Sequence, residues 1–151
     1  MTYNRIVFVG ESGNSRAPMA AEILRSMMPA DALDIQAKGL VVLFPEPLNQ
    51  KVEAVMASNG LRTEGFLSTP LKGEDFGEKT LILTMNSSQQ ERITEQFESA
   101  QNVYVLSDYV GDELEILNPY GQSLQVYGLC FETLQRTVSR LVKKLTEGKD
   151  E

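Results

Sequence analysis

Residues 6–20, IVFVGESGNSRAPMA, join a short apolar run to a glycine-rich turn and then to the start of a helix. The apolar run Ile6–Val9 is typical of a buried strand. Pro18 is tolerated in the first turn of a helix and disfavoured farther along. In this arrangement the N–H groups of the turn 10–16 and of the helix N-terminus converge on one point, where the helix dipole favours negative charge. The guanidinium of Arg16 adds donors that match phosphate geometry, so the stretch predicts an anion site.

Strand-like and helix-like segments alternate along the chain, which indicates an α/β fold with a parallel sheet. We expect strands at 6–9, 33–37, 80–85 and 103–106, helices at about 16–28, 48–58, 88–97 and 122–147, irregular segments at 40–47, 61–78 and 107–121, and a frayed tail at 148–151. Ser88 and Glu91 have the spacing of a capping box for the third helix. Because ligands bind at the carboxyl ends of parallel strands, we expect the loops 10–16 and 107–121 to meet at one crevice.

The composition narrows the classes of partner. A chain of 151 residues fits one domain. Its net charge of −7 disfavours nucleic acid and anionic membranes, which both need a basic surface. The sequence shows no signal peptide and no apolar run of transmembrane length, so we expect a cytoplasmic protein with no membrane partner. The absence of histidine removes the commonest metal ligand, and we predict no metal and no cofactor.

The stretch Gly10–Pro18 resembles the loop V-C-x-G-N-x-C-R-S-P of low-molecular-weight protein tyrosine phosphatases. Three further stretches are similar to motifs of that family and occur in the same order: Gln36–Leu40 to S-A-G-L, Leu81–Asn86 to L-I-L-T-M-T, and Asn118–Gly121 to the Asp-Pro-aromatic-Gly of bacterial members. The resemblance covers nearly the whole chain. It implies one domain over 1–151, a three-layer α/β/α sandwich with a four-stranded parallel sheet of the phosphotyrosine phosphatase I-like type.

The resemblance also implies a mechanism that this chain departs from. In the family a thiolate attacks phosphorus, the loop and its arginine hold the phosphate oxygens, and an aspartic acid protonates the leaving phenol. An ungapped alignment on Arg16 and Pro18 puts Gly10 at the cysteine, and the similarity of Asn118–Gly121 to the Asp-Pro-aromatic-Gly motif puts Asn118 at the aspartic acid. Glycine offers no nucleophile, and an amide cannot donate a proton at neutral pH. A register shifted by one residue puts Glu11 at the cysteine and restores no thiol.

The polar residues that support the family's loop are lost as well. Gly13, Ala17, Ala37 and Phe66 stand at polar positions of the family, which is coherent with the loss of a thiolate. We therefore expect a catalytically impaired member, a pseudophosphatase. Its ligand would be phosphate or a phosphorylated protein or small molecule, and its oligomeric state is not predicted. The residues expected to bind phosphate are Glu11, Ser12, Gly13, Asn14, Ser15 and Arg16, with Tyr120 as a pocket wall.

Two other functions stay open. One is a weakly active phosphomonoester hydrolase that uses water, Ser12 or Ser15, although a serine nucleophile needs a base and the chain has no histidine. The other is an interaction module without an anion site, with Leu43 and Phe44 as candidates for a contact patch.

Four single residues each have two possible roles. Arg16 binds an anion, or it forms an ion pair with Glu11 or with an acid in 107–118. Glu11 points to solvent, or it points into the loop and opposes an anion. Tyr120 is an aromatic wall or half-buried packing, and Asn118 shapes its loop or contacts a ligand.

Residues outside the loop have simpler expectations. Cys130 falls on the apolar stripe of the last helix and is expected in the core. The acids of the second loop are expected to form a solvated face, with a metal site as the alternative; they are Asp108, Asp112, Glu113 and Glu115.

Overall fold

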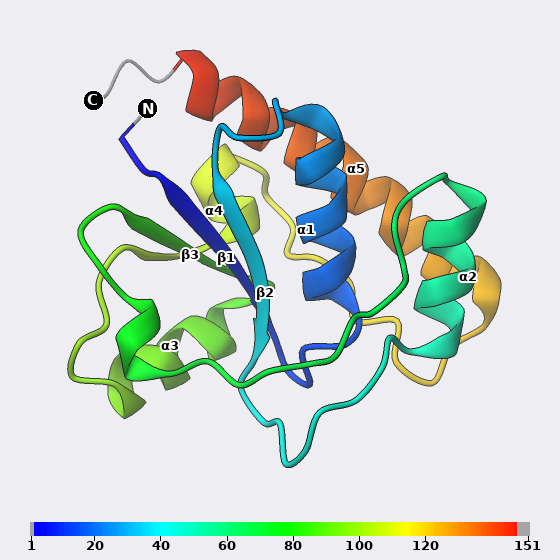
Figure 1. Ribbon diagram of the computed structural model, residues 1–151, viewed down its shortest axis with the longest axis horizontal. Coiled ribbons are helices and arrows are strands. Elements are labelled where there is room, and N and C mark those ends of the chain that lie inside the picture. Colours follow the sequence, from blue (N-terminus) through cyan, green and yellow to red (C-terminus); the bar gives the residue numbers. More distant parts are fainter. Residues whose placement is uncertain (1, 148–151) are drawn as a thin grey trace.

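The computed structural model of the protein describes residues 2–147, so the predicted tail lies outside the described residues. Its four-stranded parallel sheet has the order β2-β1-β3-β4 (Figure 1). The strands are β1 (Arg5–Gly10), β2 (Asp34–Gly39), β3 (Thr80–Thr84) and β4 (Val103–Val105). The two central strands, β1 and β3, are apolar and almost entirely buried, as expected for a sheet covered on both faces. The predicted α/β fold is confirmed.

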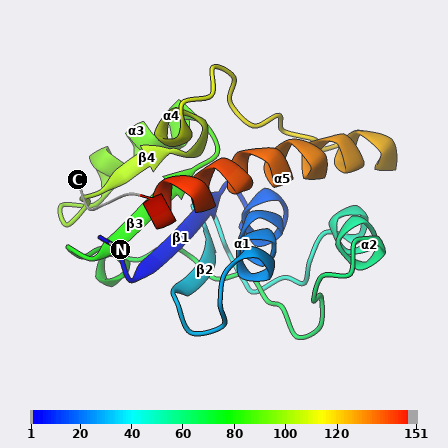
Figure 2. The same cartoon turned by 90° about the horizontal axis from the view of Figure 1, so that it is seen from above.

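Helices cover the two faces of the sheet (Figures 1 and 2). They are α1 (Arg16–Met27), α2 (Gln50–Ser58), α3 (Ser87–Gln96), α4 (Leu106–Val110) and α5 (Leu124–Glu147), and a 3-10 turn spans Gly73–Asp75. Alternate residues of β1 divide the core, because successive side chains of a strand point to opposite faces. Ile6 and Phe8 pack in the cluster with α1, α2 and α5, whereas Val7 and Val9 pack with Ile93 of α3. This gives the expected three layers.

Each strand differs from its predicted range by one or two residues at an end, and two of these differences change the description of the sheet. Strand β2 runs to Gly39, past the expected end at residue 37, because its pairing with β1 continues to the pair Gly10–Gly39. The fourth strand ends at Val105, and residues 106–110 form helix α4 where we expected a strand end and a loop. Gly111 ends that helix with φ 85°, a left-handed conformation that glycine adopts without strain.

The predicted capping box of the third helix is wrong. The N-cap of α3 is Asn86, whose Oδ1 accepts a hydrogen bond from the backbone N–H of Gln89 at 2.9 Å. Ser88 lies inside the helix, in its first turn. The cap therefore lies two residues earlier than predicted, and the N–H group that receives it is that of Gln89 instead of that of Glu91.

Short turns, residues 11–15 and 85–86, join the carboxyl ends of β1 and β3 to α1 and α3, so these turns lie at the same edge of the sheet. Residues 40–47 are irregular, as predicted, and the N–H groups of Leu40 and Val41 bond to the loop after β1 at this edge. Within the described residues, no helix is both long enough and apolar enough to cross a bilayer.

Candidate anion-binding site

A cavity of about 370 Å³ lies where the loop after β1 meets the segment before α5. Its lining consists of Gly10, Glu11, Ser12, Gly13, Asn14, Ser15, Arg16, Glu46, Asn49, Asn118 and Tyr120. The structure therefore brings the predicted loop residues together with Asn118 and Tyr120, and the expected crevice between the two loops is confirmed. Sequence reasoning missed Glu46 and Asn49, although Asn49 stands where an N-cap of α2 is expected, and it caps that helix.

Main-chain hydrogen bonds hold the loop to neighbouring segments. The N–H of Leu40 lies 3.0 Å from the carbonyl oxygens of both Gly10 and Glu11, and the N–H of Val41 donates to Glu11 at 2.9 Å. The carbonyl of Asn14 accepts from the N–H of Asn49 at 3.0 Å, next to the start of α2. These bonds use backbone groups alone, so they do not depend on the side chains that the loop carries.

Two glycines allow the loop to touch the end of β2. Gly13 has φ 79°, and a Cβ added there would lie 2.9 Å from the backbone nitrogen of Gly39. A Cβ added at Gly39 would lie 2.7 Å from the carbonyl carbon of Ser12. Both distances are too short for real atoms, so this contact needs glycine on each side.

Arg16 begins α1 and is buried, with 5% of its surface exposed. Its Nη1 donates to the carbonyl oxygen of Ile116 at 2.9 Å. No carboxylate of the described residues forms an ion pair with it, so the alternative of a structural salt bridge to Glu11 or to an acid in 107–118 is wrong. Burial lowers the pKa of Arg16, and the nearby Cys130 and Glu11 oppose that shift. A buried guanidinium with unused donors at a cavity favours an anionic ligand.

The polar side chains in the middle of the loop bond to one another. The hydroxyl of Ser12 donates to Oδ1 of Asn14 at 2.7 Å. The amide nitrogen of Asn14 donates to the carbonyl of Pro47 at 3.2 Å and approaches Oε1 of Glu46 at 3.5 Å. An amide oxygen cannot take the proton of a serine hydroxyl, so the partner of Ser12 is no general base. Ser15 is the N-cap of α1 and makes no side-chain capping bond.

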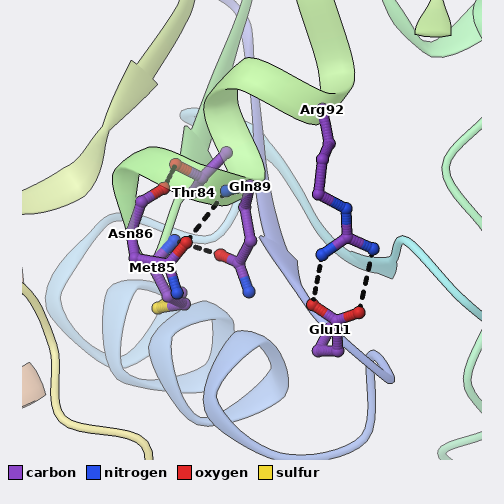
Figure 3. A network of polar contacts seen from close by, with 6 residues as sticks. All are labelled: Glu11, Thr84, Met85, Asn86, Gln89 and Arg92. Carbon is purple, nitrogen blue, oxygen red and sulfur yellow. Dashed lines mark hydrogen bonds and ion pairs between the residues drawn. The ribbon is translucent and has the colours of Figure 1, made fainter.

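Glu11 is exposed but paired. Both of its oxygens accept from Arg92 of α3, at 2.8 and 2.9 Å (Figure 3). The hydrogen bonds from Arg92 lower the pKa of Glu11, and Gln89 and Arg16 contribute in the same direction. The carboxylate thus points toward α3, which neither of our two expectations for Glu11 included.

At Gly10 the backbone leaves room for a side chain. A Cβ added there would lie 3.6 Å from the Cβ and 3.7 Å from the backbone nitrogen of Ala17, which are ordinary contacts.

Across the cavity, Oδ1 of Asn118 accepts from the N–H of Tyr120 at 3.1 Å, so Asn118 shapes its loop while it also lines the cavity. Tyr120 is 79% exposed. Half-buried packing of this ring is therefore wrong, and its place is on the wall of the cavity.

The remaining candidates do not line the cavity. Cys130 is buried in the core, as predicted, and burial raises the pKa of its thiol to about 11. Asp112 pairs with Arg140, and Glu115 accepts from the N–H of Ser87 at 2.9 Å. In the part of the chain that the structure describes, no group of three or more acidic or cysteine side chains could hold a metal ion.

Comparisons with known proteins agree with this architecture. The family described as low molecular weight phosphotyrosine protein phosphatase matches residues 5–151. The chain is 29% identical over 142 residues to a low molecular weight protein-tyrosine-phosphatase, PtpB, of Staphylococcus haemolyticus, covering 91% of this chain and 96% of that protein. It is 27% identical over 143 residues to a protein-arginine-phosphatase of Geobacillus stearothermophilus, covering 93% and 95% of the two chains.

Solved structures give the same result. The low molecular weight protein tyrosine phosphatase from T. tengcongensis superposes with a TM-score of 0.86 at 25% identity, covering 93% of this chain and 98% of that chain. The YwlE arginine phosphatase from Geobacillus stearothermophilus also gives 0.86, at 26% identity, covering 96% and 94%. The chain therefore belongs to the low molecular weight phosphotyrosine protein phosphatase family.

Proposed function

We propose that this protein binds a phosphorylated ligand in the 10–16 loop and does not hydrolyse it by a cysteine mechanism. The observation that carries the proposal is Arg16, a buried guanidinium without an ion pair among the described residues, at a cavity that the whole loop lines. The loop N–H groups and the start of α1 add partial positive charge at the same place. The protein is thus a pseudophosphatase whose loop binds a phosphoryl group without hydrolysing it.

The loop and the facing segment lack the nucleophile and the general acid that the family's mechanism uses. Gly10 has no side chain, and Asn118 has an amide where the resemblance implies an acid. Cys130 is buried and its thiol stays protonated at neutral pH, so it cannot replace a thiolate at the loop. These features support binding without turnover.

The names of the relatives suggest the class of ligand. They include phosphatases of protein tyrosine and of protein arginine residues. We infer that the ligand here is a phosphorylated side chain of a protein, with its phosphoryl group at Arg16 and the rest of the side chain beside Tyr120.

Inorganic phosphate tests the binding proposal directly. A ligand at 100 times its Kd stabilises a protein by about 2.7 kcal/mol, which raises the Tm of a chain of this size by roughly 5–10 °C. We expect this shift for the native protein and its loss in Arg16→Met, which keeps the length of the side chain and removes its donors. Arg136→Met is the matched control, because Arg136 is exposed and does not line this cavity. Calorimetric titration at a temperature where Arg16→Met is folded separates lost binding from lost stability.

Hydrolysis of a small aryl phosphate tests the catalytic proposal. We expect no phenol release from the native protein. Turnover that disappears in Ser12→Ala or Ser15→Ala would overturn the proposal and establish the serine route. No phosphate binding by the native protein would overturn the anion site and favour the interaction module, which the exposure of Leu43 (87%) and Phe44 (63%) supports.

A further inference from the structure

An anion-binding loop that contains an acid has an electrostatic problem. Glu11 follows Gly10 directly and is one of the residues that line the cavity. A free carboxylate at this position would repel a phosphate group, and it would compete for the donors of Arg16. Arg16 lies close enough for its charge to lower the pKa of Glu11. Phosphate binding at this loop therefore requires that the charge of Glu11 is balanced elsewhere.

Arg92 balances the negative charge of the Glu11 carboxylate. The guanidinium meets both carboxylate oxygens, Nη1 to Oε1 at 2.8 Å and Nη2 to Oε2 at 2.9 Å (Figure 3). This two-point geometry fixes the direction of the carboxylate as well as its charge. Arg92 does not line the cavity, so its contact with the site passes through Glu11.

The helix that carries Arg92 is tied to the sheet beside the loop. The side chain of Asn86 caps α3, and Oε1 of Gln89 accepts from the N–H of Met85 at 2.8 Å. The hydroxyl of Thr84, the last residue of β3, donates to the carbonyl of Asn86 at 2.9 Å. Because Gln89 and Arg92 are three residues apart, they share a face of α3, and Figure 3 shows both directed toward the segment that carries Glu11. These bonds fix the start of α3 beside the loop, and the two hydrogen bonds to Glu11 hold the guanidinium of Arg92.

We propose that the Glu11–Arg92 ion pair is a positioning element of the phosphate site: Arg92 draws the Glu11 carboxylate toward α3 and cancels its charge, which leaves Arg16 free for the phosphoryl group. The inference rests on the proposed function, since it explains how an acid-containing loop binds an anion. Arg92 acts through Glu11 and is not itself a ligand-binding residue.

A double-mutant cycle tests this role, with orthophosphate as the probe and calorimetric titration at low ionic strength, where surface charges are weakly screened. Arg92→Gln leaves an unbalanced carboxylate, and we expect phosphate affinity to fall about tenfold, which corresponds to a repulsion of about 1.4 kcal/mol. Glu11→Gln should bind phosphate at least as tightly as the native protein. The double variant should recover to within about threefold of Glu11→Gln, because no charge remains to be balanced.

Arg140→Gln is the matched control. It breaks the ion pair with Asp112, which also lies at the surface, and it removes one positive charge away from the cavity. We expect its phosphate affinity to equal that of the native protein. Circular dichroism confirms that each variant is folded before titration.

The outcomes separate this inference from the function on which it rests. No phosphate binding by the native protein overturns both. Native binding with an unchanged affinity in Arg92→Gln overturns only the role of the ion pair. A double variant as weak as Arg92→Gln also overturns it, because Arg92 would then contact the anion directly. An equal loss in Arg140→Gln would do the same, since the effect would come from net charge.

Discussion

Replacing Gly10 with cysteine would place a thiol beside the candidate anion site, and the backbone can accept the change. The added Cβ would make ordinary contacts with Ala17, at 3.6 and 3.7 Å. Gly10 is not among the residues of positive φ, so a side chain there causes no backbone strain. Loss of a glycine restricts the unfolded chain and stabilises a compatible site by roughly 0.4–1 kcal/mol. We expect Gly10→Cys to fold with a Tm no lower than that of the native protein.

The surroundings of position 10 favour a thiolate. The buried guanidinium of Arg16 and the N-terminus of α1 lower the pKa of a nearby thiol. Arg16 already acts in this direction on Cys130, although burial outweighs it there. The sulfur can attack the phosphorus of an aryl phosphate, forming a sulfur–phosphorus bond as the bond to the phenol oxygen breaks. Water then releases phosphate and regenerates the thiolate.

The amide at position 118 sets the magnitude of the activity expected for Gly10→Cys. Asn118 cannot protonate a leaving phenolate, and a general acid is worth ~10²–10⁴-fold in rate. We expect Gly10→Cys to hydrolyse p-nitrophenyl phosphate, whose leaving group needs little protonation, and to be slow with phenyl phosphate. Adding Asn118→Asp should raise the rate with phenyl phosphate by about 10²–10⁴-fold.

Release of the two phenols, measured side by side, tests the reasoning. Gly10→Ser is the control, and we expect it to be inactive because no base can deprotonate the serine. If folded Gly10→Cys binds phosphate but releases neither phenol, the reasoning is refuted, because the loop would then not hold phosphorus in line with position 10.

Three further results are expected. Cys130 should react with iodoacetamide very slowly at pH 7 and faster as the pH approaches its pKa of about 11, and rapid labelling of the native protein at pH 7 would contradict its burial. Gly39→Ala should lower the free energy of unfolding by about 1–3 kcal/mol and weaken phosphate binding, because the new methyl group would overlap the backbone of Gly13 at 2.8 Å; a native Tm would disprove this contact. The Glu11–Arg92 pair lowers the pKa of the carboxyl below its ordinary 4.5, so its stabilisation is present above that pH and is lost as the pH falls through the lowered pKa. Arg92→Gln should therefore cost about 0.2–1 kcal/mol in urea unfolding at neutral pH and nothing once Glu11 is protonated, and a cost that does not change with pH would contradict the ion pair.

The fold was predictable where local pattern and tertiary structure agree. The apolar run before the loop, the proline in the first turn of α1 and the apolar stripe of α5 each reflect burial or backbone geometry within one segment. Helix α4 was missed because residues 106–110 form only a short helix, too short for a periodic pattern to distinguish from a strand end. The cap of α3 was misplaced because Asn86 and Ser88 are both good capping residues.

The site was predictable to the extent that one segment builds it. The loop residues, Asn118 and Tyr120 were identified because motifs mark them. The partner of Glu11 was not, since Arg92 lies 81 residues away and shows no local signal. The bond from Arg16 to a carbonyl was missed for a related reason: every residue has a carbonyl, so sequence alone cannot select Ile116 as the acceptor.

The contact between Gly13 and Gly39 has a consequence for how this site can change over evolutionary time. The loop and the end of β2 touch through backbone atoms, and backbone hydrogen bonds join the loop to residues 40, 41 and 49. These contacts preserve the outline of the loop whatever side chains it carries. The outline of the loop is thereby independent of its side chains: position 10 can lack a nucleophile and position 11 can carry an acid without a change in the backbone. The same property makes positions 11, 12, 14 and 15 good sites for a combinatorial library, in which new specificities can be selected without first having to rescue folding.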